Sequence, residues 1–166
     1  MTARDLLRHL VATLAYRAAK VLRDAPPDFA TAAVGPGTTR RPVQIVAHLA
    51  DLMAWANTFV QGEVRWTAAG SEDWNVEVQR FFSGLATLDR ELANDSTSLG
   101  SAEQIVQGPL ADALTHVGQL ALLRGMAGAP VRPESYAQAR IVAGAVGLEQ
   151  AAPRREFDGD ASAKRR

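Results

Sequence analysis

The sequence predicts an all-α protein that folds as a four-helix bundle. Three observations support this prediction. Four long segments repeat apolar residues at intervals of three and four, loops rich in glycine and proline separate them, and no β pattern of useful length occurs. Amphipathic helices of this kind bury their apolar stripes against one another. At 166 residues the chain is long enough to form one domain with a substantial core.

The first two helices are predicted at residues 2–23 and 42–62. Thr2 is a suitable N-cap for the first helix, and the following Pro-Pro pair at 26–27 closes it. Pro42 suits the first turn of the second helix, because a first-turn residue needs no hydrogen-bonded N–H. The glycine-rich stretch between the two helices, residues 28–40, is expected to form a loop.

The third helix is predicted at residues 73–93 and the fourth at 101–127. Gly84 costs the third helix roughly 1 kcal/mol relative to alanine, so we expect it to allow a close helix approach or access to a pocket. Ser101 is a candidate N-cap for the fourth helix. Pro109 falls within that helix and predicts a kink or a separate short first segment.

The periodic pattern weakens after Pro133. Residues 134–145 are expected to form a short helix that two nearby glycines limit. From residue 151 the chain is rich in proline, arginine, aspartate and glycine, which predicts an extended or mobile tail.

The composition excludes several classes of function. Lys plus Arg and Asp plus Glu both number 18, so the formal net charge is zero and nothing favours nucleic acid or a membrane surface. No cysteine is present, which removes disulfides, thiolate metal sites and cysteine nucleophiles. The start of the chain lacks a secretory pattern, and no stretch has the length of apolar sequence that a membrane helix requires. We therefore expect a cytoplasmic protein.

Asp112, His116 and His48 form the strongest candidate site. Asp112 and His116 are four residues apart, so on a helix their side chains project from the same face. His48 lies on the margin of the apolar stripe of the second helix, as the pair does on the fourth. Imidazole and carboxylate are common ligands for Zn²⁺, Ni²⁺ and Fe²⁺. The alternative is a hydrogen-bonded core-margin histidine beside an ordinary helix-surface ion pair.

Neighbouring residues are assigned supporting roles. Asp51 is three residues from His48 and either orients it or faces solvent. Gln119, one turn beyond His116, is expected to line the same cavity. The third histidine, His9, is interpreted as a surface or packing residue. The tryptophans at 55, 66 and 74 are interpreted as core or loop anchors.

With these residues in view, residues 1–132 resemble the DinB/YfiT-like family of four-helix bundles. The resemblance rests on His48 followed by an aromatic residue at Trp55, and on the run His-Val-Gly-Gln at 116–119 that leads to Leu-Arg-Gly at 123–125. The family typically has one metal-binding histidine in the second helix and a His-x3-His pair in the fourth. Asp112 stands where the first histidine of that pair is usual, so the resemblance implies a site of two histidines and one carboxylate.

The resemblance also implies a function and a domain organisation. Residues 1–132 would form the bundle, and residues 133–166 a partly irregular C-terminal extension that is packed on the bundle or mobile. The implied activity is that of a metal-dependent thiol S-transferase or hydrolase, with zinc, nickel or iron, a small-molecule substrate such as a low-molecular-weight thiol, and a homodimeric state. The alternative is a non-catalytic bundle that binds a small molecule or partner, or a stress-related dimeric scaffold whose metal site is structural or vacant.

Overall fold

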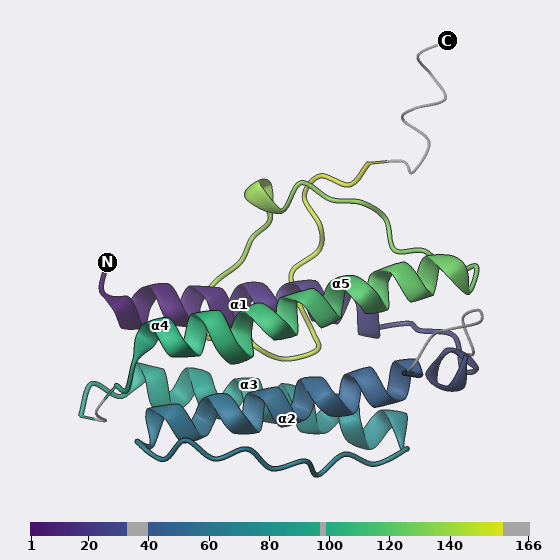
Figure 1. The fold of residues 1–166 in the computed structure, drawn as a ribbon. Helices are drawn as coiled ribbons and strands as arrows, with labels where there is room; N and C mark the ends of the chain where they lie inside the picture. The colour runs from purple at the N-terminus through teal and green to yellow at the C-terminus, as the bar shows by residue number, and fades with distance from the viewer. Residues whose placement is uncertain (33–39, 97–98, 158–166) are drawn as a thin grey trace.

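The computed structural model describes residues 1–32, 40–96 and 99–157, and within these residues it is all-helical apart from loops, turns and one isolated β-bridge (Figure 1). The predicted all-α bundle is confirmed. Its long helices are α1 (Ala3–Leu22), α2 (Pro42–Val60), α3 (Trp74–Ala93) and α5 (Ala111–Met126). Each begins and ends within two residues of the predicted limits, except that the fourth predicted helix is divided. The loop prediction for residues 33–39 lies outside the described residues.

The helices are arranged as two parallel pairs that run in opposite directions (Figure 1). α1 lies beside α5 and runs in the same direction, whereas α2 and α3 lie together and run the other way. Because α2 and α3 are parallel, residues 61–73 must return along the full length of the bundle to connect them. This crossover segment follows the outer side of α2, and it contributes to the site described below.

Local sequence explains where the helices begin. Thr2 and Asp5 form a capping box, with the Asp5 N–H donating to Thr2 Oγ1 at 3.1 Å and the Thr2 N–H donating to Asp5 Oδ2 at 2.8 Å. Pro42 occupies the first turn of α2, and Ser101 accepts a hydrogen bond from the Gln104 N–H. Thr2 and Ser101 thus satisfy backbone donors that the first helical turn leaves without partners, whereas Pro42 has no N–H that needs one.

The fourth predicted helix is divided by its proline. A short helix, α4 (Ala102–Ile105), leads into a π-helical turn, Val106–Leu110, and then into α5. Pro109 lies inside this turn, where its missing N–H and its ring prevent a regular i to i−4 hydrogen bond. A π-helical turn contains one residue more than an α-helical turn. This additional residue changes the direction in which the side chains at the start of α5 point, and Asp112 is among them.

Gly84 allows the close approach of α3 to α2. A Cβ at this position would lie 2.7 Å from Met53 Cβ, which is shorter than any normal contact. The expectation of a close helix approach at Gly84 is therefore confirmed. The core between the helices is apolar, and its largest fully buried side chains come from α1, α2, α3, α4, the 3-10 turn Phe29–Thr31 and the π-helical turn that precedes α5. These side chains are Phe29, Phe81, Leu7, Leu14, Leu49, Leu52, Met53, Leu85, Leu88, Leu92, Ile105 and Leu110.

The predicted helix at 134–145 is wrong. Only a 3-10 turn, Tyr136–Gln138, forms there, and Gly144 adopts a positive φ of 90°, which a regular helix does not permit. The segment instead runs across the bundle, and the apolar Val146 is buried against the core. Apolar burial is thus achieved without helical periodicity. The tail prediction beyond residue 157 lies outside the described residues.

The C-terminal segment is attached to α1 by a polar cluster. The Tyr16 hydroxyl donates to Glu134 Oε1 at 2.8 Å, and the Lys20 ammonium donates to Glu134 Oε2 and to Glu156 Oε1, both at 2.7 Å. Glu134 and Glu156 also face each other in the isolated antiparallel β-bridge. The Glu134 side chain is fully buried, so its charge depends on these two partners.

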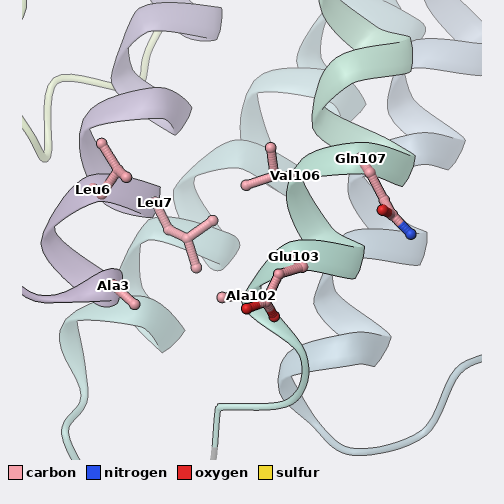
Figure 2. A pocket seen from close by; sticks show the side chains of 7 residues that line it. All are labelled: Ala3, Leu6, Leu7, Ala102, Glu103, Val106 and Gln107. Atoms are coloured by element: carbon pink, nitrogen blue, oxygen red, sulfur yellow. The ribbon is translucent and has the colours of Figure 1, made fainter.

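An apolar groove lies between the first turns of α1 and the α4 region (Figure 2). Its volume is about 460 Å³. Its lining residues are Ala3, Leu6, Leu7, Ala102, Glu103, Val106 and Gln107, and none belongs to the candidate metal group. Among the described residues, no helix is both long and apolar enough to cross a membrane.

Candidate metal centre

The structure brings His48, Asp112 and His116 together. α2 packs against α5, and the three side chains meet between these helices. His48 Nε2 lies 3.5 Å from Asp112 Oδ2, and His116 Nε2 lies 3.4 Å from Asp112 Oδ1. One donor atom from each residue lies within 4.8 Å of the others. The group predicted from helical spacing is therefore assembled in the fold, and it could hold a metal ion.

The two imidazoles are more enclosed than the carboxylate. The exposed fractions of the side chains are 12% for His116, 21% for His48 and 47% for Asp112. The imidazole rings lie edge to face, with centroids 4.8 Å apart. The histidines thus form the inner wall of the group and Asp112 its solvent side. A site open on one side can accept water or a substrate as a further ligand.

Gln119 fixes the orientation of His116. Gln119 Oε1 lies 2.7 Å from His116 Nδ1, so it accepts a hydrogen bond when that nitrogen carries the proton. His116 Nε2 then carries the lone pair, and it is the nitrogen that faces Asp112. A hydrogen bond of this kind behind a ligand selects the metal-binding tautomer. Gln119 therefore contacts the candidate group through His116, and the expectation that it lines a cavity there stays a prediction.

The surroundings of His48 favour its neutral form. Burial lowers the pKa of His48 below its ordinary value, and the nearby charges of His116 and Arg40 act in the same direction. Asp112 opposes this shift but does not reverse it. Only a neutral imidazole has a free lone pair for a metal ion, so the environment of His48 keeps it in the form that binds metal at neutral pH.

One tryptophan, Trp66, lies against His48 and is itself packed on a second, Trp55. Trp66, carried by the crossover segment, has its ring centroid 5.6 Å from that of His48 and 5.7 Å from that of Trp55. Trp66 is 46% exposed, so part of its ring borders solvent beside the site. Trp74, in contrast, packs on Phe29 and anchors α3 as expected. The place of Trp66 beside His48 was not predicted, because the crossover segment has no periodic pattern.

Asp51 does not orient His48. It is buried, and its Oδ1 accepts hydrogen bonds from Arg80 Nη1 at 2.6 Å and from the Ala69 N–H at 3.1 Å. Both alternatives left by the sequence, a partner for His48 or a solvent-facing residue, are therefore wrong. Arg80 was not visible as a partner because it lies 29 residues away on another helix. His9 is exposed on α1 and lies outside the candidate group, as expected.

The donor set fits a small divalent cation. Ligand bonds of about 2.0–2.2 Å place the donor atoms of a tetrahedral ion roughly 3.3–3.6 Å apart. The separations of 3.5 Å from His48 Nε2 to Asp112 Oδ2 and of 3.4 Å from His116 Nε2 to Asp112 Oδ1 have this length, each to a different carboxylate oxygen, and the set with one atom from each residue lies within 4.8 Å. Two imidazole nitrogens and one carboxylate oxygen also form a donor set that binds zinc, iron(II) or nickel. The residues present therefore fit a metal ion of this class.

The fold and the site together define an all-α bundle with a candidate three-residue metal centre between two of its helices. Comparisons of the chain with protein-family models, with curated proteins and with solved structures gave no match. The functional argument consequently rests on the residues of this chain and on the chemistry of their arrangement.

Proposed function

We propose that this protein is a divalent-metal-dependent enzyme of the kind implied by the resemblance to the DinB/YfiT-like family, and that it acts as a thiol S-transferase or hydrolase. The observation that carries the proposal is the meeting of His48, Asp112 and His116 with donor atoms within 4.8 Å of one another. An enclosed pair of imidazoles with one solvent-facing carboxylate leaves space for a reacting ligand.

Each residue has a defined part in this proposal. His48 and His116 supply nitrogen ligands from two helices, and Asp112 supplies a carboxylate oxygen from the solvent side. Gln119 holds His116 in the tautomer that leaves Nε2 free. A bound divalent ion would lower the pKa of a coordinated water or thiol and so supply the nucleophile. Trp66 covers one side of His48 and limits the access of bulk water to the site.

The proposed metal is zinc, nickel or iron(II). A site of two nitrogens and one oxygen is compatible with all three. A carboxylate in place of a third histidine lowers the net charge of the occupied centre by one. It also makes the donor set harder, so we expect Asp112 to influence which ion is preferred. The proposed substrate is a small molecule, such as a low-molecular-weight thiol with an electrophilic partner.

Metal analysis of untagged protein tests the proposal directly. We expect about one equivalent of metal per chain in the unaltered protein and a loss of most of it in His48→Ala and in His116→Ala, because each change removes one of three ligands. His9→Ala is the matched control, since it removes an exposed histidine outside the group and should retain the metal.

Three results decide between the enzyme and its alternatives. Protein that contains no metal and gains no thermal stability from Zn²⁺, Ni²⁺ or Fe²⁺ would contradict the metal site itself. Metal that binds equally well to His48→Ala and His116→Ala would place it elsewhere. Metal bound at the group, without turnover in a panel of thiols, electrophiles and hydrolysable esters and amides, would contradict the enzyme and favour a structural metal in a binding protein or scaffold.

A further inference from the structure

We propose that the hollow beside His48 binds the anionic group of a small molecule, and that Arg40 is the residue that recognises it. The hollow lies between the first half of α2 and the end of the crossover segment, and its volume is about 260 Å³. It is lined by Arg40, Gln44, Ala47, His48, Asp51, Ala68, Gly70, Ser71 and Glu72. Because His48 is part of its wall, a molecule held there would lie next to the candidate metal centre.

The acidic side chains of the hollow are already held by other partners. Asp51 accepts a hydrogen bond from Arg80 at 2.6 Å, and Glu72 accepts one from Arg41 at 2.7 Å and one from Gln44 at 3.2 Å. These contacts direct both carboxylates towards fixed donors. A ligand carboxylate entering the hollow would therefore meet acids whose charges are paired.

Arg40 is different, because it makes no ion pair within the part of the chain that the structure describes. Its guanidinium carries five N–H donors and no acceptor, and a carboxylate or phosphate is the group that satisfies them best. Arg40 and His48 line the same hollow. Arg40 is thus close enough to the metal group to position a ligand against it.

The anion preference comes from these free donors and not from an excess of positive charge. Around the hollow, three arginines balance three acids in formal charge, namely Arg40, Arg41 and Arg80 against Asp51, Glu72 and Glu77. The hollow lies at the N-terminal end of the 19-residue helix α2, whose dipole adds a modest preference for negative charge. Recognition by directed hydrogen bonds should therefore depend strongly on the guanidinium geometry.

The neighbouring tryptophan suggests how the rest of the ligand lies. Along α2, His48 separates the Arg40 hollow from the Trp66 ring. A molecule with its anionic group on Arg40 and an apolar part against Trp66 would pass directly over His48. The inference rests on the proposed function in assigning this anion to the substrate, which would then be a small carboxylate or phosphate ester. The anion site itself requires no metal.

Titration with benzoate tests the site, in metal-free and in zinc-treated protein. Benzoate combines a carboxylate with an apolar ring, benzamide is its neutral counterpart, and inorganic phosphate tests the other anion. We expect benzoate to shift the NMR signals of the Gln44 side-chain amide and the Ser71 backbone amide, and benzamide to bind at least about tenfold more weakly, as expected for the loss of one charge-assisted contact. If benzoate binds with higher affinity than inorganic phosphate, the site prefers a carboxylate; the opposite order indicates a phosphate.

The variants separate this site from other binding. Arg40→Ala should weaken benzoate binding about tenfold, and Arg40→Lys should recover part of it, because lysine keeps the charge without the planar fork. Arg90→Ala is the matched control, since that arginine is 69% exposed on α3 and does not line the hollow. Equal benzoate affinity in Arg40→Ala and unaltered protein, or equal binding of benzoate and benzamide, would overturn the inference. The apolar groove of Figure 2 is one place where the ring alone could bind.

Titration of the metal-free protein tests the anion site separately from the proposed metalloenzyme function. If zinc does not bind but benzoate binding depends on Arg40, the anion site stands and the metalloenzyme proposal fails. If zinc binds at His48 and benzoate binding is unaffected by Arg40→Ala, the anion site fails and the metal centre stands.

Discussion

Gln119 is not a candidate ligand, but we expect it to influence the metal affinity of the centre through its contact with His116. Its 2.7 Å contact with His116 Nδ1 selects the tautomer that leaves Nε2 free. We expect Gln119→Ala to weaken zinc binding about tenfold, because His116 would then sample both tautomers and more ring orientations. Competition with a chelating dye measures the affinity.

The control for Gln119 lies on the same helix. Thr115 is exposed and its hydroxyl donates to the Ala111 carbonyl, so Thr115→Ala should leave zinc affinity unchanged. Gln119→Glu keeps an acceptor oxygen for His116 and should retain most of the affinity. Equal zinc affinity in Gln119→Ala and the unaltered protein would show that the contact does not orient a ligand.

At the scale of single elements, the α2–α3 pair is set by Gly84. A Cβ there would lie 2.7 Å from Met53 Cβ, an atom attached directly to the backbone that cannot rotate away. Gly84→Ala gains roughly 1 kcal/mol of helix propensity, whereas overpacking costs about 1–3 kcal/mol. Because the helices themselves must separate, we expect the steric cost to prevail and the free energy of unfolding to fall by up to about 2 kcal/mol. Urea denaturation measures this change.

Gly118 provides the matched glycine. It lies within α5, and a Cβ at this position would meet nothing within 4 Å. Gly118→Ala should therefore raise the free energy of unfolding by about 0.5–1 kcal/mol through propensity alone. Opposite signs for the two substitutions are the expected result. A stabilising Gly84→Ala would contradict the close approach.

The crossover segment, residues 61–73, shows how an element without periodicity acquires a fixed path. Its backbone N–H groups at Ala69 and Ser71 donate to Asp51 and Glu77, and Arg80 joins the two carboxylates. This network holds the segment against α2 and thereby brings Trp66 to His48. The site consequently depends on contacts that lie outside the metal group.

At the scale of the whole molecule, the helices and the three candidate ligands could be predicted from the sequence, whereas several residues that surround the ligands could not. Caps at Thr2 and Ser101 and the apolar periodicity mark the helices, because helix formation is governed by near neighbours. The positions of His48 and His116 on helix margins predicted their meeting correctly. The roles of Arg80 and Trp66 depend on partners far away in sequence, which no local pattern reveals. The segment 134–145 failed as a helix for the same reason, since tertiary packing determines its shape.

The attachment of the C-terminal segment to α1 predicts how the whole fold responds to alkaline pH. Burial raises the pKa of Tyr16 well above its ordinary value of 10.0, and the hydrogen bond to Glu134 adds to this shift. In the unfolded chain Tyr16 loses its proton near pH 10, whereas in the folded protein it keeps it. The stabilising contribution is therefore complete below pH 10 and is lost as pH rises above it, by up to about 1.4 kcal/mol per pH unit. Lys20 adds to the loss in this range, because hydrogen bonds to Glu134 and Glu156 raise its pKa although burial opposes them.

Substitution of Tyr16 isolates its part of this alkaline response. Tyr16→Phe removes the ionisable group but leaves Lys20 and its two carboxylate partners in place. We expect the unfolding free energy of Tyr16→Phe to be lower than that of the unaltered protein at pH 8, because the buried Glu134 loses a donor. We expect the difference to shrink as pH rises above 10, because only the unaltered protein pays for keeping Tyr16 protonated.

Tyr136→Phe is the matched control, since Tyr136 lies edge-on to Tyr16 and its hydroxyl makes no hydrogen bond within the described residues. Parallel stability curves for Tyr16→Phe and the unaltered protein from pH 8 to pH 11.5, measured by urea denaturation at about half-unit steps, would show that the Tyr16–Glu134 contact is not maintained in solution.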